Sequence, residues 1–110
     1  MMDGDVPRDV AAMPLVSVLI PAFNHERFVQ RCLDSVLEDP YPAKELIVID
    51  DGSTDRTAER IADWVAMHCM DIPIEYVRRE NRGIAATLNE LAARANGDFL
   101  RPGASDDYLL

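Results

Sequence analysis

Residues 46–55 read LIVIDDGSTD, an apolar run that ends in two carboxylates, a glycine and three further polar residues. Consecutive aliphatic residues rich in β-branched side chains predict a strand buried on both faces. Gly52 permits a tight turn, and the polar residues after it can accept the free N–H groups of a following helix. Asp50 and Asp51 are therefore expected where a buried strand emerges, at the edge where α/β sheets bind their ligands.

The same strand-turn-helix pattern recurs along the chain. Short apolar runs predict strands at 15–20, 45–50, 73–77 and 98–102, the third nearer an edge because it alternates and begins with proline. Apolar residues at helical spacing predict helices over 28–37, 58–69 and 84–95, with Asn24 as a cap, Pro40 as a stop and Asn96-Gly97 as a left-handed cap. The predicted fold class is α/β: a Rossmann-like parallel sheet with helices on both faces.

Composition narrows the possible partners. The 110 residues carry a formal net charge of −9, and a chain of this length buries one core. Nucleic acid is excluded as a partner, because phosphate-backbone binding depends on clustered Lys and Arg. A phosphorylated small molecule remains compatible, since a divalent cation held by carboxylates can carry an anionic ligand into an acidic site.

The remaining composition predicts an ordinary intracellular domain. No apolar run approaches the roughly 20 residues that span a bilayer, and the N-terminal residues lack a signal-peptide pattern. We therefore expect a soluble, cytoplasmic protein with a flexible leader at 1–13 and a domain over 14–110. Cys32 and Cys69 lie among apolar residues of predicted helices, which favours buried free thiols over a disulfide or a zinc site.

Two further signals fall at the same predicted edge. Phe23 and Asn24 follow the first strand, where an aromatic face and an amide could flank a nucleobase; core packing and helix capping are the structural alternatives. Asp106 and Asp107 follow the fourth strand, and two carboxylates there suit a hard cation. On local evidence alone, DDGSTD is as well explained by turn chemistry as by a binding site.

Four segments in order, VSVLIPAFNHERFVQRCLDSVL, ELIVIDDGSTDRTAERI, NRGIAATLNELAARANGDFL and SDDYLL, together closely resemble the N-terminal, nucleotide-sugar-binding half of family 2 glycosyltransferases of the GT-A fold. The resemblance covers residues 15–110. It implies transfer of a sugar from a nucleotide-diphosphate donor to an acceptor, with Mg or Mn bound at a DxD-type motif. The implied donor-binding residues are Pro21, Ala22, Phe23, Asn24, Asp51, Arg82, Gly83 and Asp106, and the implied metal ligands are Asp106 and Asp107.

The chain departs from the family pattern in two respects. Ala104 stands where many relatives have the first carboxylate of a DxDD motif, so this chain lacks one of the carboxylates that such a motif offers to the metal. The family's acceptor site and catalytic base lie further along than Leu110, so a donor-binding half, inactive alone, is expected. Apolar surface and an open sheet edge left uncovered in such a half predict self-association.

Other functional classes fit less well. A receiver-like signalling domain is also acidic, doubly wound and rich in paired aspartates, but its phosphoacceptor after the third strand has no counterpart at Val77-Arg78-Arg79. A dinucleotide-binding oxidoreductase is disfavoured because no GxGxxG motif follows the first predicted strand of this chain. A non-catalytic binding module stays open. Arg78 and Arg79 are expected on a solvated face, and Arg82 is expected near a phosphate of the donor. These motifs do not specify the sugar, the acceptor (glycan, lipid-linked or protein) or the stereochemistry of the transfer.

Overall fold

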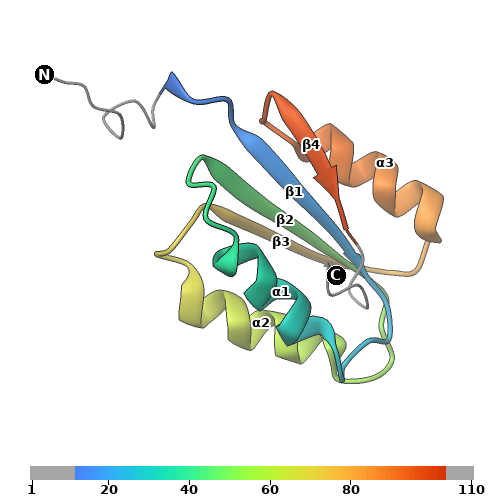
Figure 1. Ribbon diagram of the computed structural model, residues 1–110. Coiled ribbons are helices and arrows are strands. Elements are labelled where there is room, and N and C mark those ends of the chain that lie inside the picture. The colour runs from blue at the N-terminus through green and yellow to red at the C-terminus, as the bar shows by residue number, and fades with distance from the viewer. Residues whose placement is uncertain (1–11, 104–110) are drawn as a thin grey trace, which may run out of the picture.

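The computed structural model describes residues 12–103, in which strands and helices alternate (Figure 1). The elements are β1 (Val16–Ala22), α1 (Val29–Glu38), β2 (Lys44–Asp51), α2 (Thr57–His68), β3 (Ile74–Arg79), α3 (Ile84–Arg94) and β4 (Phe99–Pro102). Each predicted strand and helix is present within two residues of its expected bounds. No helix in this range has the length and apolar character that a membrane span requires. Residues 1–11, most of the predicted leader, lie outside the described range.

The strands form one parallel sheet in the order β3-β2-β1-β4. β3 lies at an edge, as its proline and alternation predicted, and β4 forms the other edge. After β3 the chain crosses back past β1, so the strand order reverses beside β1, and such reversal points are where open α/β sheets bind ligands. The receiver-like alternative is wrong in this respect, because a receiver has the order 2-1-3-4-5.

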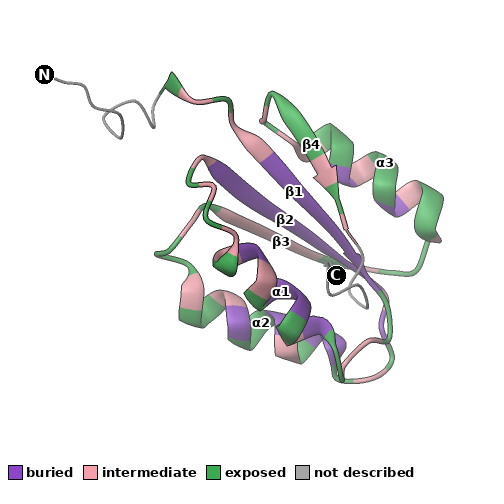
Figure 2. Cartoon of the chain, viewed as in Figure 1, coloured by how far each residue is buried: buried purple, intermediate pink, exposed green. Residues whose placement is uncertain are grey.

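Helices cover both faces of the sheet, as predicted. α1 and α2 lie on one face and α3 lies on the other (Figure 1). The larger core joins α1 and α2 to β1 and β2, and it includes Leu33, Val48 and Ile61. The smaller core contains Leu19, Ile47, Ile49 and Leu91, which place α3 against the opposite face. β1 and β2 are buried along most of their length, whereas β4 is largely exposed (Figure 2).

Buried polar groups connect α3 to the amino-terminal end of the sheet. The Glu45 carboxylate accepts hydrogen bonds from the Ser17 hydroxyl at 2.6 Å and from the Asn96 backbone N–H at 2.8 Å. Burial alone would raise the pKa of Glu45, but these donors and the Asn96 amide lower the pKa below its usual value. The predicted left-handed cap at Asn96-Gly97 is wrong, since neither residue has a positive φ. Gly97 instead permits close approach, because a Cβ there would lie 2.5 Å from the Ser17 Oγ.

One prediction of helix burial needs correction, and one helix is only partly covered. Cys32 is a buried free thiol as expected, but Cys69 is exposed: it follows the end of α2, beyond Trp64, the last residue of that helix to be buried. On α3, Leu91 is fully buried, whereas Ile84 is 61% exposed and Leu88 is 38% exposed. The apolar face of α3 is therefore only partly covered by the described sheet.

Candidate functional site

The loops at the carboxyl ends of β1, β2 and β3 enclose a pocket of about 340 Å³. Its walls come from segments far apart in the sequence: the end of β1 and the loop after it, the end of β2, and the loop that leads into α3. The lining residues are Pro21, Ala22, Phe23, His25, Asp51, Asn81, Gly83, Ile84 and Thr87. The pocket therefore occupies the edge of the sheet at which the sequence placed a binding site.

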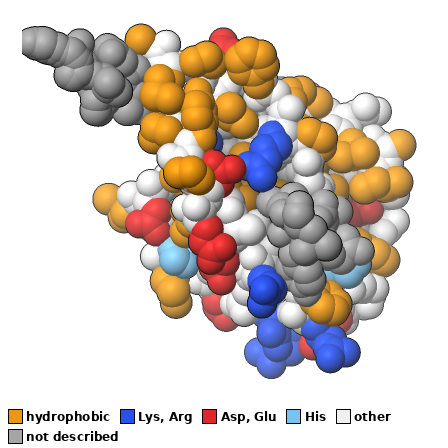
Figure 3. Space-filling model, in the orientation of Figure 1, with side chains coloured by type: hydrophobic (Ala, Val, Ile, Leu, Met, Phe, Trp, Pro, Cys, Tyr) orange, Lys and Arg blue, Asp and Glu red, His pale blue; other side chains and the backbone are white. Residues whose placement is uncertain are grey.

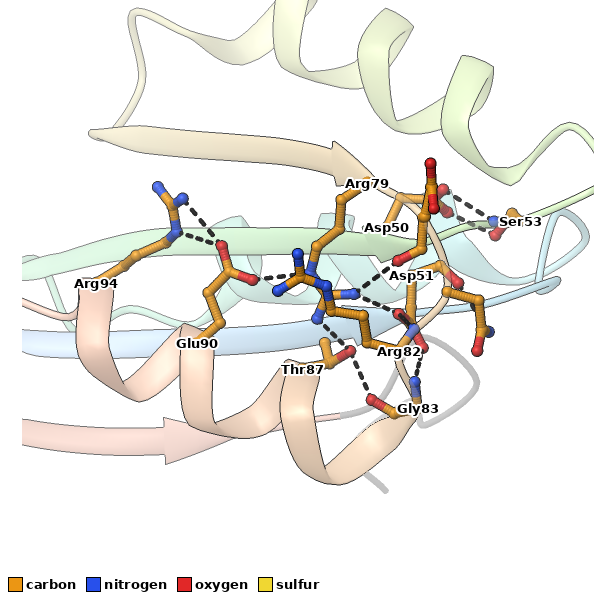
Figure 4. Close-up of polar contacts among 11 residues, drawn as sticks. Asp50, Asp51, Ser53, Arg79, Arg82, Gly83, Thr87, Glu90 and Arg94 are labelled. Carbon is orange, nitrogen blue, oxygen red and sulfur yellow. Dashed lines mark hydrogen bonds and ion pairs between the residues drawn. The ribbon is translucent and has the colours of Figure 1, made fainter.

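Among the described residues that line the pocket, Asp51 is the acidic one, and its carboxylate accepts three hydrogen bonds (Figure 4). The N–H of Arg82 and the guanidinium of Arg79 donate to Oδ1, and the N–H of Gly83 donates to Oδ2 at 3.1 Å. Burial alone would raise the pKa of Asp51, but these donors lower the pKa below its usual value. A carboxylate can accept about four hydrogen bonds, so Asp51 is an ionised group with acceptor capacity left on Oδ2.

Asp50 has a different environment. Alternation along β2 turns it to the α1/α2 face, where it is fully buried. Its carboxylate accepts hydrogen bonds from the Ser53 N–H at 3.0 Å and the Ser53 hydroxyl at 2.5 Å. Asp50 therefore serves the turn, and Asp51 serves the pocket.

The remaining polar residues of DDGSTD join the β1–α1 loop to the β2–α2 loop. The Thr54 N–H donates to the Asn24 Oδ1 at 2.8 Å, and the Asn24 N–H donates to the Ser53 Oγ at 2.9 Å. Asp55 accepts from the N–H of Thr57, the first residue of α2, as predicted for a residue at a helix start. The prediction that Asn24 caps α1 is wrong, because Asn24 has a φ of 51° and faces the other loop while α1 begins only at Val29.

Two glycines shape the pocket wall. Gly52 has a φ of 77°, as a tight turn after Asp51 requires, and a Cβ there would lie 2.6 Å from the Asn81 N. Gly83 has a φ of 91°, and a Cβ on it would meet open space. Gly83 therefore provides a backbone conformation that aims its N–H at Asp51 directly before α3 begins.

Arg79 is not on a solvated face, which corrects the prediction from sequence. Its side chain is 10% exposed and lies between β3 and α3, where it contacts Asp51, Thr87 and Glu90. Side chains alternate between the two faces of the sheet along a strand, so Arg79 shares the α3 face with Val77. Arg78 points to the opposite face and is exposed, as predicted.

The structure brings together part of the predicted donor-binding set. Pro21, Ala22, Phe23, Asp51 and Gly83 line the pocket. Asn24 acts in the loop junction instead, and Arg82 contributes its backbone N–H to Asp51 without lining the pocket. Asp106 and Asp107 lie outside the described residues, so their assignment stays a prediction.

Sequence reasoning did not assign four of the lining residues to the site: His25, Asn81, Ile84 and Thr87. Ile84 and Thr87 are one helical turn apart at the start of α3, a spacing that could have indicated a shared face. The Asn81 Nδ2 donates a hydrogen bond to the Asp51 carbonyl at 3.0 Å, and no local sequence pattern predicts this contact.

Within residues 12–103, no cluster of three His, Cys, Asp or Glu side chains could hold a metal ion. β4 runs parallel to β1, and Gly103, the last described residue, donates its N–H to the Leu19 carbonyl at 2.9 Å. β4 therefore runs toward the same carboxyl edge of the sheet as β1.

Comparison with protein families identifies the chain. The family described as glycosyl transferase family 2 matches residues 17–109. The chain belongs to this family. Among curated proteins it is 32% identical over 94 residues to glycosyltransferase GlyA of Streptococcus pneumoniae, covering 86% of this chain. The receiver-like alternative finds no support in these relatives.

Solved structures with similar sequences share the fold. The mannosyltransferase PcManGT from Pyrobaculum calidifontis, in complex with GDP-Man and Mn2+, superposes with a TM-score of 0.80 at 31% identity over 89% of this chain. S. aureus TarS 1-349, in complex with UDP, gives a TM-score of 0.75 at 26% identity over 86% of this chain. The parallel sheet with helices on both faces is thus a portion of the GT-A fold.

The chain spans only part of these proteins. It covers 13% of the length of GlyA, 29% of the mannosyltransferase chain and 28% of the TarS chain. The matched part therefore shows the family and the fold, and the activity of the whole protein is a matter for proposal.

Proposed function

We propose that the chain supplies the donor-binding part of a metal-dependent glycosyltransferase and that its pocket holds the nucleoside of a nucleotide-diphosphate sugar. The observation that carries the proposal is the pocket beside Asp51, where an ionised carboxylate with spare acceptor capacity adjoins the ring of Phe23. Related structures that contain GDP-Man and UDP support a nucleotide ligand.

Each part of the pocket has a chemical role in this proposal. Phe23 is 41% exposed and offers its ring as a stacking surface for the base. The Asp51 Oδ2 accepts a hydrogen bond from a ring N–H, an interaction that a carboxylate can make only as an acceptor. Arg82 is exposed beside Gly83, and we assign its guanidinium to a phosphate of the donor because Arg matches phosphate geometry.

The proposal includes a divalent cation, Mg or Mn, held by Asp107 with Asp106. Carboxylate oxygens are the ligands that hard cations prefer, and a related structure contains Mn2+ together with GDP-Man. When bound, the cation would neutralise the diphosphate leaving group.

The same proposal covers the acceptor and the location of the protein. The acceptor is a glycan, a lipid-linked group or a protein group. The protein is located in the cytoplasm or at the inner face of the membrane. Fractionation of cells that express the tagged full-length protein would test that location.

Calorimetric titration of the 110-residue chain with GDP and with UDP, each with and without Mn2+, tests donor binding. We expect at least millimolar affinity for one of them, about 4 kcal/mol of binding free energy. Phe23→Ala should weaken binding, whereas Phe99→Ala, which removes an exposed ring on β4 outside the pocket, should not. An absence of heat and of chemical-shift change with every nucleotide would refute the proposal.

The metal is tested separately. Asp107→Ala should abolish the Mn2+ dependence of nucleotide binding, because a hard cation that loses a carboxylate keeps too few oxygen ligands. Asp51→Asn should weaken binding while the Mn2+ dependence persists, since its proposed partner is the base. If Asp107→Ala leaves the Mn2+ dependence unchanged, the ligand assignment is wrong.

A further inference from the structure

Arg79 connects the pocket to α3. It is the last residue of β3 and stands opposite Asp51 in the parallel register of β2 and β3. Its NH1 donates to the Asp51 Oδ1, its NH2 donates to the Thr87 Oγ1 at 2.7 Å, and its Nε donates to the Glu90 Oε1 at 2.7 Å. The buried guanidinium therefore joins a strand end, a pocket wall and a helix.

The ion pairs continue beyond Arg79 along α3 (Figure 4). Glu90 also pairs with Arg94 at 2.9 Å, and Arg94 pairs with Glu75 of β3. Acidic and basic groups therefore alternate from the pocket to the far end of the helix: Asp51, Arg79, Glu90, Arg94 and Glu75. Arg79 and Asp51 are the most buried pair of this series, with side chains 10% and 7% exposed.

We propose that Arg79 is a positioning residue of the donor site, which fixes the Asp51 carboxylate by its Oδ1 and leaves Oδ2 to accept the ring N–H of the base. This inference rests on the proposed function. Arg79 acts through Asp51 and does not line the pocket itself. Its hydrogen bond to Thr87 also fixes the position of the first turns of α3 relative to the Asp51 carboxylate.

The geometry explains why an arginine occupies this position. A guanidinium presents five N–H donors in a fixed plane, and Arg79 directs them to Asp51, Thr87, Glu90 and the Glu80 carbonyl. A lysine ammonium is a point charge on a flexible stem, so it would keep the charge beside Asp51 without fixing the orientation of its carboxylate.

The test compares Arg79→Gln with Arg78→Gln, which removes the same charge from the neighbouring, exposed position on the opposite face of β3. At pH 7, Arg79→Gln should weaken the binding of the nucleotide that the parent chain prefers by about tenfold, the typical effect of losing one charge-assisted hydrogen bond. Arg78→Gln should leave the affinity unchanged. Equal affinities of the parent and Arg79→Gln would overturn the proposal.

A second readout follows the ionisation of Asp51 directly. The ¹³Cγ shift of Asp51, assigned with Asp51→Asn, is titrated in the parent chain and both variants. Among residues 12–103, the charged and titratable residues next to Asp51 or across the pocket from it are Arg79 on β3, Arg82 in the loop before α3, Glu90 on α3 and His25. Without Arg79 the effect of burial is less opposed, so the Asp51 midpoint and the pH at which nucleotide affinity is half lost should both rise. If the midpoint rises while the affinity stays that of the parent, Arg79 does not position the carboxylate.

Two controls keep every outcome decisive. If Arg79→Gln fails to fold by circular dichroism, Arg79→Lys replaces it: weakened binding with a low Asp51 midpoint supports positioning, and parent-like affinity overturns it. If the parent chain binds no nucleotide, the proposed function fails. The ¹³Cγ titration of Asp51 then still shows whether Arg79 controls the ionisation of Asp51: a midpoint that is the same in the parent chain and in Arg79→Gln means that it does not.

Discussion

Asp50 and Asp51 are adjacent in the sequence, yet their carboxylates lie on opposite faces of the sheet. Asp50 is bonded to Ser53 on the side of α1 and α2, and Asp51 is bonded to Arg79 and the loop before α3 (Figure 4). The period of two along a strand produces this division. The two aspartates of the motif therefore serve different parts of the structure, Asp50 the turn and Asp51 the wall of the pocket.

Asp50→Ala should lower the free energy of unfolding by about 1–3 kcal/mol, because the buried N–H and hydroxyl of Ser53 lose their acceptor. Urea denaturation followed by circular dichroism measures the change. Asp63→Ala, which removes an exposed carboxylate from α2, is the matched control and should stay within about 0.5 kcal/mol of the parent. A loss no larger than that of the control would show that Asp50 does not stabilise the turn.

The loop junction predicts a difference between two substitutions at Asn24. Both Asn24→Gly and Asn24→Ala remove the acceptor of the Thr54 N–H, but only alanine retains a Cβ at a φ of 51°. Asn24→Ala should therefore be less stable than Asn24→Gly by about 1–2 kcal/mol, the cost of the left-handed conformation. Chemical denaturation of the two variants side by side measures it, and equal stabilities would indicate that the loop relaxes away from positive φ.

The sequence predicted much of the fold because the relevant signals are local. Apolar runs and helical spacing set the strands and helices, and the positions of Phe23 and Asp51 at strand ends predicted that they would meet. The contacts that complete the site are not local: Arg79 meets Asp51 across 28 residues and Thr54 meets Asn24 across 30. Alternation along β3 could have separated Arg79 from Arg78, but the sequence-based prediction put both on a solvated face, and the partners of Arg79 became evident only in three dimensions.

Acid should weaken the fold partly through Glu45, whose folded-state pKa lies below its usual value. A lowered carboxyl pKa contributes stability that is complete above the unfolded-state value and is lost as the pH falls through the folded-state value. The free energy of unfolding should therefore decline from about pH 5 downward, and Glu45→Gln should make this decline shallower. Urea denaturation between pH 7 and pH 3 measures the slope, with Glu38→Gln on the exposed side of α1 as the control. An unchanged slope in Glu45→Gln would contradict the assignment.

The chain is expected to self-associate through the side of the molecule that carries β4. β4 is an edge strand whose Phe99 and Leu100 are 61% and 49% exposed, and exposed apolar edges favour pairing with another chain. Apolar side chains gather over the part of the surface that contains β4 and the start of β1 (Figure 3). Sedimentation velocity over a range of concentrations should show association that Phe99→Ser weakens. Met70→Ser should leave it unchanged, because this substitution removes a 93% exposed apolar side chain from the connection between α2 and β3, and β3 lies at the opposite edge of the sheet from β4. If the parent chain sediments as a monomer at every concentration, or if both substitutions weaken association equally, the β4 edge is not the interface.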